Sequence, residues 1–266
     1  MQDDRDQSSS LPAGSNGQEP ELPEDSERFQ NPAAFNIPAV ILISVAVLVS
    51  VHLLRVIWLT PSDDEALLFA FAFFPVRFDS FFMERYGDAF PGGTLGAFST
   101  SVTYSFLHAD WLHLTVNMFW MLVFGSALAR RFGAVRFLLL SLIGSVAGAG
   151  LHLATNWGSS APVVGASAAI SAHMACAARF AFVPYGPLGR PRSDHPGAFF
   201  LPALSIADMF KNSQVVSFLA IWFAVNLLFG VGTGLGGGSA VAWQAHIGGF
   251  LAGLLLFPLI DPVERA

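Results

Sequence analysis

Ser167 stands at the start of an apolar run, where it is one hydroxyl among the small and apolar residues 163–170. If this run is a helix that begins near Ser167, free backbone N–H groups and the positive end of the helix dipole lie beside the hydroxyl. Both stabilise the oxyanion that forms when a serine attacks a carbonyl. The other interpretation is a packing residue that lets two helices approach closely. Ser167 is therefore a candidate nucleophile, and it needs a base.

His246 is the candidate base. It precedes Gly249 and Gly253 in a second apolar run, and a Gly-x-x-x-Gly spacing gives a helix a flat face against which another backbone can pack. His246 lies three residues before Gly249 and therefore on the same face. If this face packs against the start of the Ser167 run, the imidazole could take the proton of the hydroxyl. A hydrogen-bonded structural histidine is the alternative. The face of the Ser167 run that would meet the glycine face consists of the small residues Gly165, Ala168, Ala169 and Ala172.

His113 and Asn117 are four residues apart in a third apolar run. On a helix they project from one face, one turn apart. Two neutral hydrogen-bond donors on one stripe can bind a developing negative oxygen. They can equally form a hydrogen-bonded pair between two helices, and the spacing leaves both interpretations open.

The composition indicates the kind of chain to which these residues belong. Of 266 residues, 53% are apolar and 12% are charged, which is typical of a protein that spans a membrane several times. Eight acidic and two basic residues lie between Asp3 and Arg28 and account for the whole formal charge of −6. No basic surface that could hold nucleic acid is expected. The single Cys176 excludes a disulfide within the chain.

The chain is expected to have two parts. Residues 1–35 are acidic and rich in Ser, Pro, Gly and Gln, so we predict a disordered tail. The tail lacks the basic start of a signal peptide. Residues 36–262 are expected to form a membrane domain.

Six apolar runs in this domain approach the length of about 20 residues that crosses a hydrocarbon core. Because a backbone in lipid must form its hydrogen bonds internally, we predict that all six are helices and that the fold is an all-α polytopic bundle. The predicted spans are 37–59, 102–127, 135–155, 164–183, 214–230 and 240–260.

The connections between the spans predict the orientation. Residues 60–101 are half apolar but are interrupted by Pro75 and Pro91, which favours a partly helical insertion at the membrane interface over a seventh span. Lys and Arg collect on the cytoplasmic side of membrane proteins. Both termini are therefore predicted to be cytoplasmic, with Ser167 just below the outer surface. The basic residues that carry this prediction follow the second and fourth spans: Arg130, Arg131, Arg136, Arg190, Arg192 and Lys211.

Taken together, these residues resemble the rhomboid family of intramembrane serine proteases. Their order, their spacing and their predicted helices all fit the family, and the likeness covers about residues 37–260. It implies a six-helix bundle with an insertion between the first two helices. The motifs are His113-x-x-x-Asn117 in the second span, Gly165-x-Ser167 opening the fourth, and Ala245-His246-x-x-Gly249-x-x-x-Gly253 in the sixth.

The resemblance also implies an activity. This is hydrolysis of peptide bonds in or near the transmembrane segments of single-pass proteins, within the lipid bilayer. A dyad of Ser167 and His246 would perform it with no acidic third member, and with no metal or other cofactor. His113, Asn117 and the Ser167 backbone N–H would form the oxyanion hole. The compact six-span form is typical of bacterial members, which implies the inner membrane of a bacterium.

Further site residues follow from the resemblance. Gly165, Gly249 and Gly253 would let the two helices of the dyad pack closely. Water would enter through a polar cavity lined in part by His108 and Gln244. The fifth helix would open to admit substrate past the gate residues Phe218, Trp222 and Phe223.

The chain departs from the family pattern near the serine. Ala168 replaces a glycine that usually follows it, which adds a methyl group where the helices approach. Ser171 replaces an aromatic residue that often stacks on the histidine, and Trp243 or Phe250 could take that role.

Two other functions fit part of the pattern. One is a rhomboid-like protein that binds membrane clients without cutting them, which loss of Ser167 or His246 would have favoured. The other is a small transporter, for which Asp110 is the one acid near the second span. His108 and His113 are five residues apart, a poor spacing for a metal, so none is expected. The other polar residues of the spans are predicted to be hydrogen-bonded helix residues: His52, His152, His173 and Asn226.

Overall fold

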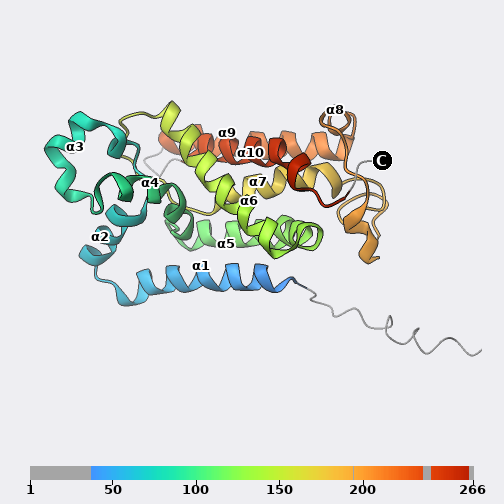
Figure 1. Cartoon of the computed structure of the whole chain (residues 1–266), viewed down its shortest axis with the longest axis horizontal. Coiled ribbons are helices and arrows are strands. Elements are labelled where there is room, and N and C mark those ends of the chain that lie inside the picture. Colours follow the sequence, from blue (N-terminus) through green and yellow to red (C-terminus); the bar gives the residue numbers. More distant parts are fainter. Residues whose placement is uncertain (1–36, 194, 236–240, 264–266) are drawn as a thin grey trace, which may run out of the picture. The chain divides into compact units, whose positions relative to one another are not determined.

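The computed structural model describes residues 37–193, 195–235 and 241–263, and only the backbone of 229–235. The predicted tail, 1–35, lies outside these residues. The described part is built from helices (Figure 1). The α-helices are α1 (Ala39–Trp58), α2 (Pro61–Phe71), α3 (Ser80–Tyr86), α4 (Gly93–Thr103), α5 (Trp111–Trp120), α6 (Ser126–Thr155), α7 (Ser167–Phe180), α8 (Ile206–Met209), α9 (Ser213–Leu235) and α10 (Trp243–Ile260). Short 3-10 helices are η2 (Pro75–Phe78), η3 (Gly87–Ala89), η4 (Tyr104–Phe106) and η6 (Pro196–Phe200), and η5 (Met121–Gly125) is a π-helical turn.

Among the described residues, three helical segments are long and apolar enough to cross a membrane: α1, Trp111–Thr155 and α10. The second of these joins α5, η5 and α6, and it is far longer than the roughly 20 residues of one crossing. Gly133 breaks it into two halves with φ 77° and ψ 169°, a conformation that glycine adopts readily. The apolar part of α9, Ser213–Leu228, is shorter.

The second predicted span begins later than its hydropathy indicates. Residues from 102 onward belong to the end of α4 and to η4, and a new helix, α5, starts only at Trp111. Asp110 fixes this start because its side chain accepts a hydrogen bond from the His113 N–H at 2.8 Å. The one acid near this span is therefore a helix cap, which removes the observation that favoured a transporter.

The fourth and fifth predicted spans also differ in length. At the fourth predicted span, the helix is α7, and it begins at Ser167 and not at residue 164. The preceding residues are not helical, because Val163 pairs with Phe73 in an antiparallel β-bridge and Gly165 has a φ of 118°. The helix also ends at Phe180, three residues early. At the fifth predicted span, the helix is α9, and it runs to Leu235, past the predicted end at residue 230.

Arg77 fastens the segment between α1 and α4, which contains the short helices α2, η2, α3 and η3. Arg77 is only 4% exposed. It donates to the carbonyls of Pro91 at 2.8 Å and Phe69 at 3.3 Å, and it lies over the Phe90 ring at 5.3 Å. Burial lowers the pKa of Arg77, but a guanidinium stays protonated in proteins, so these contacts persist.

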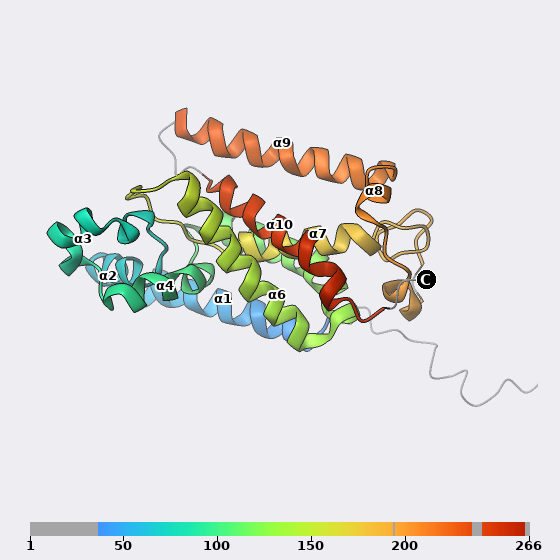
Figure 2. The same cartoon turned by 45° about the horizontal axis from the view of Figure 1, so that its top comes forward.

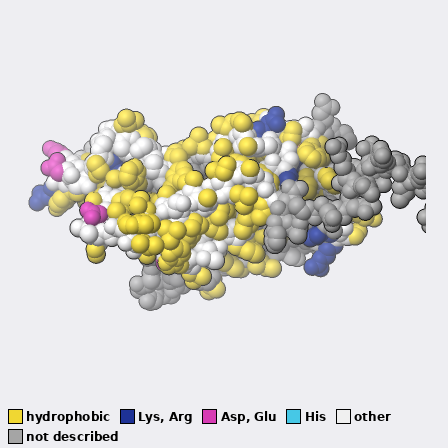
Figure 3. All heavy atoms as spheres, turned by 90° about the horizontal axis from the view of Figure 1, so that it is seen from below, with side chains coloured by type: hydrophobic (Ala, Val, Ile, Leu, Met, Phe, Trp, Pro, Cys, Tyr) yellow, Lys and Arg dark blue, Asp and Glu magenta, His cyan; other side chains and the backbone are white. Residues whose placement is uncertain are grey.

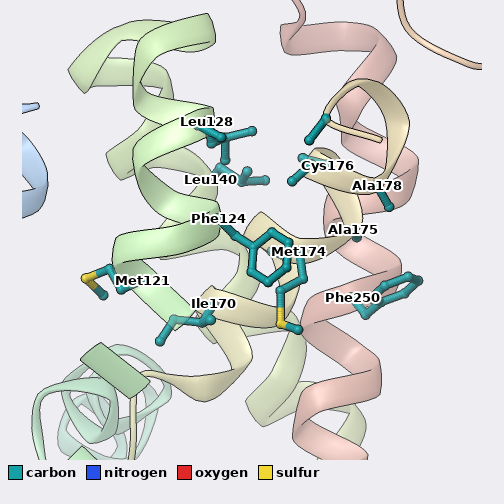
Figure 4. Close-up of a cluster of buried hydrophobic side chains, with 14 of the residues drawn as sticks. Met121, Phe124, Leu128, Leu140, Ile170, Met174, Ala175, Cys176, Ala178 and Phe250 are labelled. Carbon is teal, nitrogen blue, oxygen red and sulfur yellow. The ribbon is translucent and has the colours of Figure 1, made fainter. Parts of the chain in front are cut away.

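The centre of the bundle is α7, which lies among α5, α6 and α10 (Figures 1 and 2). Its alanine-rich sequence is buried along nearly its whole length. Apolar side chains from α5, η5, α6 and α10 close around it, including Phe124 and Phe250 (Figure 4). On α9, by contrast, a stripe of Val215, Leu219, Trp222 and Asn226 is buried while the other described side chains of the helix are more exposed.

Glycines on α10 let it approach α7 backbone to backbone. A Cβ added at Gly249 would collide with the Ala168 carbonyl, whereas Gly150 on α6 faces open space. We therefore expect Gly249→Ala to lower the free energy of unfolding by about 1–3 kcal/mol, the usual effect of overpacking, and the matched Gly150→Ala not to lower it. Unfolding of the purified variants in detergent measures both free energies. If Gly249→Ala were as stable as Gly150→Ala, α10 would be able to move away from α7 at no cost to make room for the methyl group.

Arg131 joins the end of the bundle opposite Ser167. It forms a two-point ion pair with Asp261, at 2.7 and 2.8 Å, and donates to the carbonyls of Phe199 and Leu201. Its guanidinium lies 4.6 Å from the ring of Phe180, the last residue of α7. Arg131 is therefore a buried clamp between helix ends, rather than one of the loop charges that the sequence suggested.

The surface of the described part is largely apolar. Leucine, isoleucine, valine and phenylalanine side chains of α1, α6, α9 and α10 are exposed. Figure 3 shows hydrophobic side chains covering the middle of one face, with charged side chains toward its ends. Such a surface is unfavourable in water and favourable in lipid.

Candidate active site

The structure brings Ser167 and His246 together. Ser167 is the first residue of α7, His246 lies in the first turn of α10, and the Ser167 Oγ is 2.7 Å from the His246 Nε2. Both residues are half-buried. This is the distance at which an imidazole can accept the proton of a hydroxyl nucleophile. The N-cap position, Ala166, makes no side-chain hydrogen bond to the helix, so no cap competes for the first-turn N–H groups.

The strand-like segment before Ser167 is held at two points. Val163 exchanges two backbone hydrogen bonds with Phe73, and the Gly165 N–H donates to the Tyr104 carbonyl at 3.0 Å. Gly165 has a φ of 118°, which only glycine adopts without strain. A Cβ there would also lie 2.7 Å from the His113 ring. The prediction that Gly165 packs one helix against another is therefore wrong, because Gly165 precedes the helix and instead makes room for His113.

Gly249 and Gly253 set the distance between α10 and α7. A Cβ at Gly249 would strike the Ala168 carbonyl, and one at Gly253 the Ala172 carbonyl. His246, one turn before Gly249, is thereby brought to the start of α7. The extra methyl group of Ala168 does not loosen this contact, because it is fully buried and faces Gly148 of α6, where a second Cβ would not fit.

His113 lies beside Gly165, two residues before the candidate nucleophile. A Cβ built on Gly165 would lie 2.7 Å from the Cε1 and Nε2 atoms of His113 and 3.7 Å from the Ser167 Oγ. Asn117, one turn later, donates its amide to the His113 carbonyl at 2.8 Å, so one of its two hydrogens is used within α5. His108 is fully buried, with its ring 5.1 Å from that of His113.

Asn226 of α9 is a member of this cluster that the sequence did not reveal. Its Oδ1 contacts the Nδ1 of His246, on the opposite side of the ring from Ser167. Its amide nitrogen donates to the Trp222 carbonyl at 2.7 Å. Asn226 is thus a hydrogen-bonded helix residue, as predicted, but its partner is the candidate base.

The aromatic residues near the site pack against each other. Phe250 stacks on Trp222 at 4.9 Å, and Phe223 packs edge-on against the same indole at 4.9 Å. Among the ring contacts of the described residues, none involves His246, so neither Phe250 nor Trp243 takes the stacking role expected of them. Phe218 lies two turns before Asn226 and packs against Phe124 and Phe182.

The other polar residues have ordinary partners, with one exception. His173 is bonded to Ser141 at 2.8 Å. The His152 Nδ1 lies 3.4 Å from the side-chain amide nitrogen of Asn156. His52 differs from the prediction, because neither ring nitrogen has a partner and the ring packs edge-on against Trp111 at 4.6 Å. In residues 37–193, 195–235 and 241–263, no three His, Cys, Asp or Glu side chains are grouped to hold a metal ion.

These features define an integral membrane protein of apolar helices, with a serine and a histidine hydrogen-bonded at the junction of two of them. A family model for the Rhomboid domain matches residues 96–261, a segment that begins in α4 and includes α5, α6, α7, α9 and α10. The chain therefore belongs to the rhomboid family, whose members are generally serine intramembrane proteases. A search of curated proteins finds no match.

Proposed function

We propose that the chain is an intramembrane serine protease that cuts single-pass membrane proteins in or near their transmembrane segments. The observation that carries the proposal is the 2.7 Å separation of the Ser167 Oγ and the His246 Nε2 at the first residue of α7. A serine hydroxyl that faces an imidazole nitrogen is an activated nucleophile. Membership of the rhomboid family supports the same reaction.

In this mechanism the Ser167 Oγ attacks the scissile carbonyl carbon while His246 takes its proton. His246 then gives that proton to the leaving amine, and an acyl-enzyme remains. Water enters past His108 and Gln244, loses a proton to His246 and hydrolyses the ester, which restores the Ser167 hydroxyl.

The oxyanion of each tetrahedral intermediate needs hydrogen-bond donors. The backbone N–H of Ser167 is one, because the first-turn N–H groups of a helix have no intrahelical partner. The ring of His113, beside Gly165, is a second. Asn117 can contribute the amide hydrogen that it does not donate to the His113 carbonyl.

The proposed topology has six crossings: α1, the two halves of Trp111–Thr155, α7, α9 and α10. At 14 residues, α7 is short for a crossing, but its neighbours enclose it and shield it from lipid. Both termini are proposed to be cytoplasmic, in a bacterial inner membrane. In support, Arg130 and Lys211 lie near the end of α7 that is remote from Ser167, because Arg131 lies over the Phe180 ring and Asn212 donates to the Phe182 carbonyl. The proposed gate is α9, where Trp222 and Phe223 pack with Phe250, four residues after His246 on α10, and Phe218 packs with Phe124 and Phe182.

Labelling with a serine-directed fluorophosphonate tests the proposal. The purified protein in detergent should be labelled at Ser167, located by mass spectrometry, and His246→Ala should slow labelling by about 10²–10⁴-fold because the base is lost. Ser171→Ala is the matched control. Its hydroxyl lies one turn further on and donates to the Ser167 carbonyl, so labelling should continue.

Two outcomes would overturn the proposal. A folded wild-type protein that takes up no label would support binding of membrane clients without cleavage. Label on another residue, or undiminished labelling of His246→Ala, would show that Ser167 is not activated by His246.

A further inference from the structure

Asn226 reaches the candidate base from a different helix and on the ring nitrogen that the dyad leaves unused. We propose that Asn226 is a positioning residue, which fixes the tautomer and the ring orientation of His246. The inference rests on the proposed protease function and extends it from two interacting side chains to three.

The orientation of the Asn226 amide is decided by its own helix. Asn226 is 8% exposed, and one end of its amide is 2.7 Å from the Trp222 carbonyl oxygen. A carbonyl can only accept a hydrogen bond, so the end that faces it is the NH2 group. The other end, the Oδ1, therefore faces His246.

The orientation of the amide fixes the proton on the imidazole. Because the Asn226 Oδ1 can only accept, the Nδ1 of His246 must be the donor in their hydrogen bond. In a neutral imidazole the other nitrogen then carries the lone pair. That nitrogen is the Nε2, which faces the Ser167 hydroxyl. Asn226 thus selects the one neutral tautomer in which His246 can act as a base.

The same contact serves the charged state of the ring. When His246 has taken the serine proton, its Nδ1–H still points at the amide oxygen, whose dipole favours the imidazolium. A carboxylate would favour it more strongly, but an ionised acid at membrane depth is costly. A neutral amide provides an acceptor without introducing that charge.

Little else in the described structure orients the ring. Ser171 stands where an aromatic residue could have stacked, and it donates to the Ser167 carbonyl instead. The two hydrogen bonds of His246, one at each ring nitrogen, come from α7 and α9. The stack of Trp222 on Phe250 lies next to them and holds α9 in register with α10.

Kinetics of three variants on a model transmembrane substrate in proteoliposomes test the inference. Asn226→Leu removes the acceptor and should lower kcat on the order of 10- to 100-fold, as expected for a misplaced catalytic group, with KM within about twofold. Asn226→Asp keeps an acceptor for Nδ1 but not the donor to Trp222, and should recover most of kcat. Leu219→Ala, a buried position two turns away on the same helix, weakens the packing of α9 without touching His246 and should leave kcat within about twofold.

Each alternative outcome has a distinct meaning. An Asn226→Leu protein with wild-type kcat would refute the inference. Equal losses in the Leu and Asp variants, or an equal loss in Leu219→Ala, would refute it too, because the effect would then come from the structure of α9. Thermal unfolding of each variant checks the fold, and Asn226→Ala replaces the leucine variant if that protein does not fold. A wild-type protein that neither cleaves nor takes the label would instead refute the proposed function.

Discussion

Replacing Ser167 by alanine is expected to abolish cleavage of a model transmembrane substrate and to leave the protein folded. The substitution removes only the Oγ that lies 2.7 Å from the His246 Nε2. Alanine is a good helix former and fits the first position of α7 without a clash. Because no other group in this mechanism can form the acyl-enzyme, the rate should fall on the order of 10⁴-fold or more. Gel analysis of substrate after long incubation, with thermal unfolding of the same preparation, measures both effects.

Ser171→Ala is the control for this experiment as well. It removes a hydroxyl of the same size from the same helix, one turn away, and should retain cleavage. Undiminished cleavage by Ser167→Ala would rule out Ser167 as the nucleophile. Loss of cleavage in both variants, with the fold intact, would mean that α7 tolerates no change there and would leave the nucleophile to be identified by labelling.

The largest effect on stability is expected at the other end of α7. Asp261→Asn should lower the free energy of unfolding by about 3–5 kcal/mol, because it leaves the Arg131 charge buried without its partner. The side chains of this pair are 0% and 7% exposed. Unfolding of the purified proteins in detergent measures the change.

A solvent-exposed ion pair of similar length provides the control. Asp208 and Lys211 lie 2.8 Å apart, but their side chains are 48% and 75% exposed, so Asp208→Asn should leave the unfolding temperature nearly unchanged. If both substitutions had the same small effect, the Arg131 clamp would be open to water. Replacing Arg131 and Asp261 together by Met and Leu should restore much of the stability, since no buried charge then remains.

The parts of the molecule that sequence could predict are those encoded by local patterns. Apolar runs of membrane-spanning length lie where α1, both halves of Trp111–Thr155, α9 and α10 are found. The spacing of His113, Ser167 and His246 within such runs was sufficient to indicate the rhomboid family, and the match over residues 96–261 confirms it. Hydropathy and short-range spacing carry both kinds of information.

The parts that sequence missed depend on backbone conformation or on contacts between distant residues. Hydropathy cannot show that Asp110 starts a new helix, since α4 and α5 are both rich in apolar side chains. In the sequence, Gly165 is one small residue among several, and only its φ of 118° shows that this position requires glycine. Asn226 lies in no motif, and its importance comes only from α9 lying next to α10. The sequence suggests that Arg131 is a loop charge, because its ion pair with Asp261 joins residues that are 130 positions apart.

Asn226 and the proposed gate residues Trp222 and Phe223 lie on the same helix, which links access to chemistry. If α9 swings outward to let a substrate in, the stack on Phe250 and the hydrogen bond to His246 break together. The open form would then admit a substrate but would lack an oriented base. Hydrolysis would wait for α9 to return. A substrate that leaves while α9 is open would not be cut. A substrate that stays until α9 has closed again would be hydrolysed.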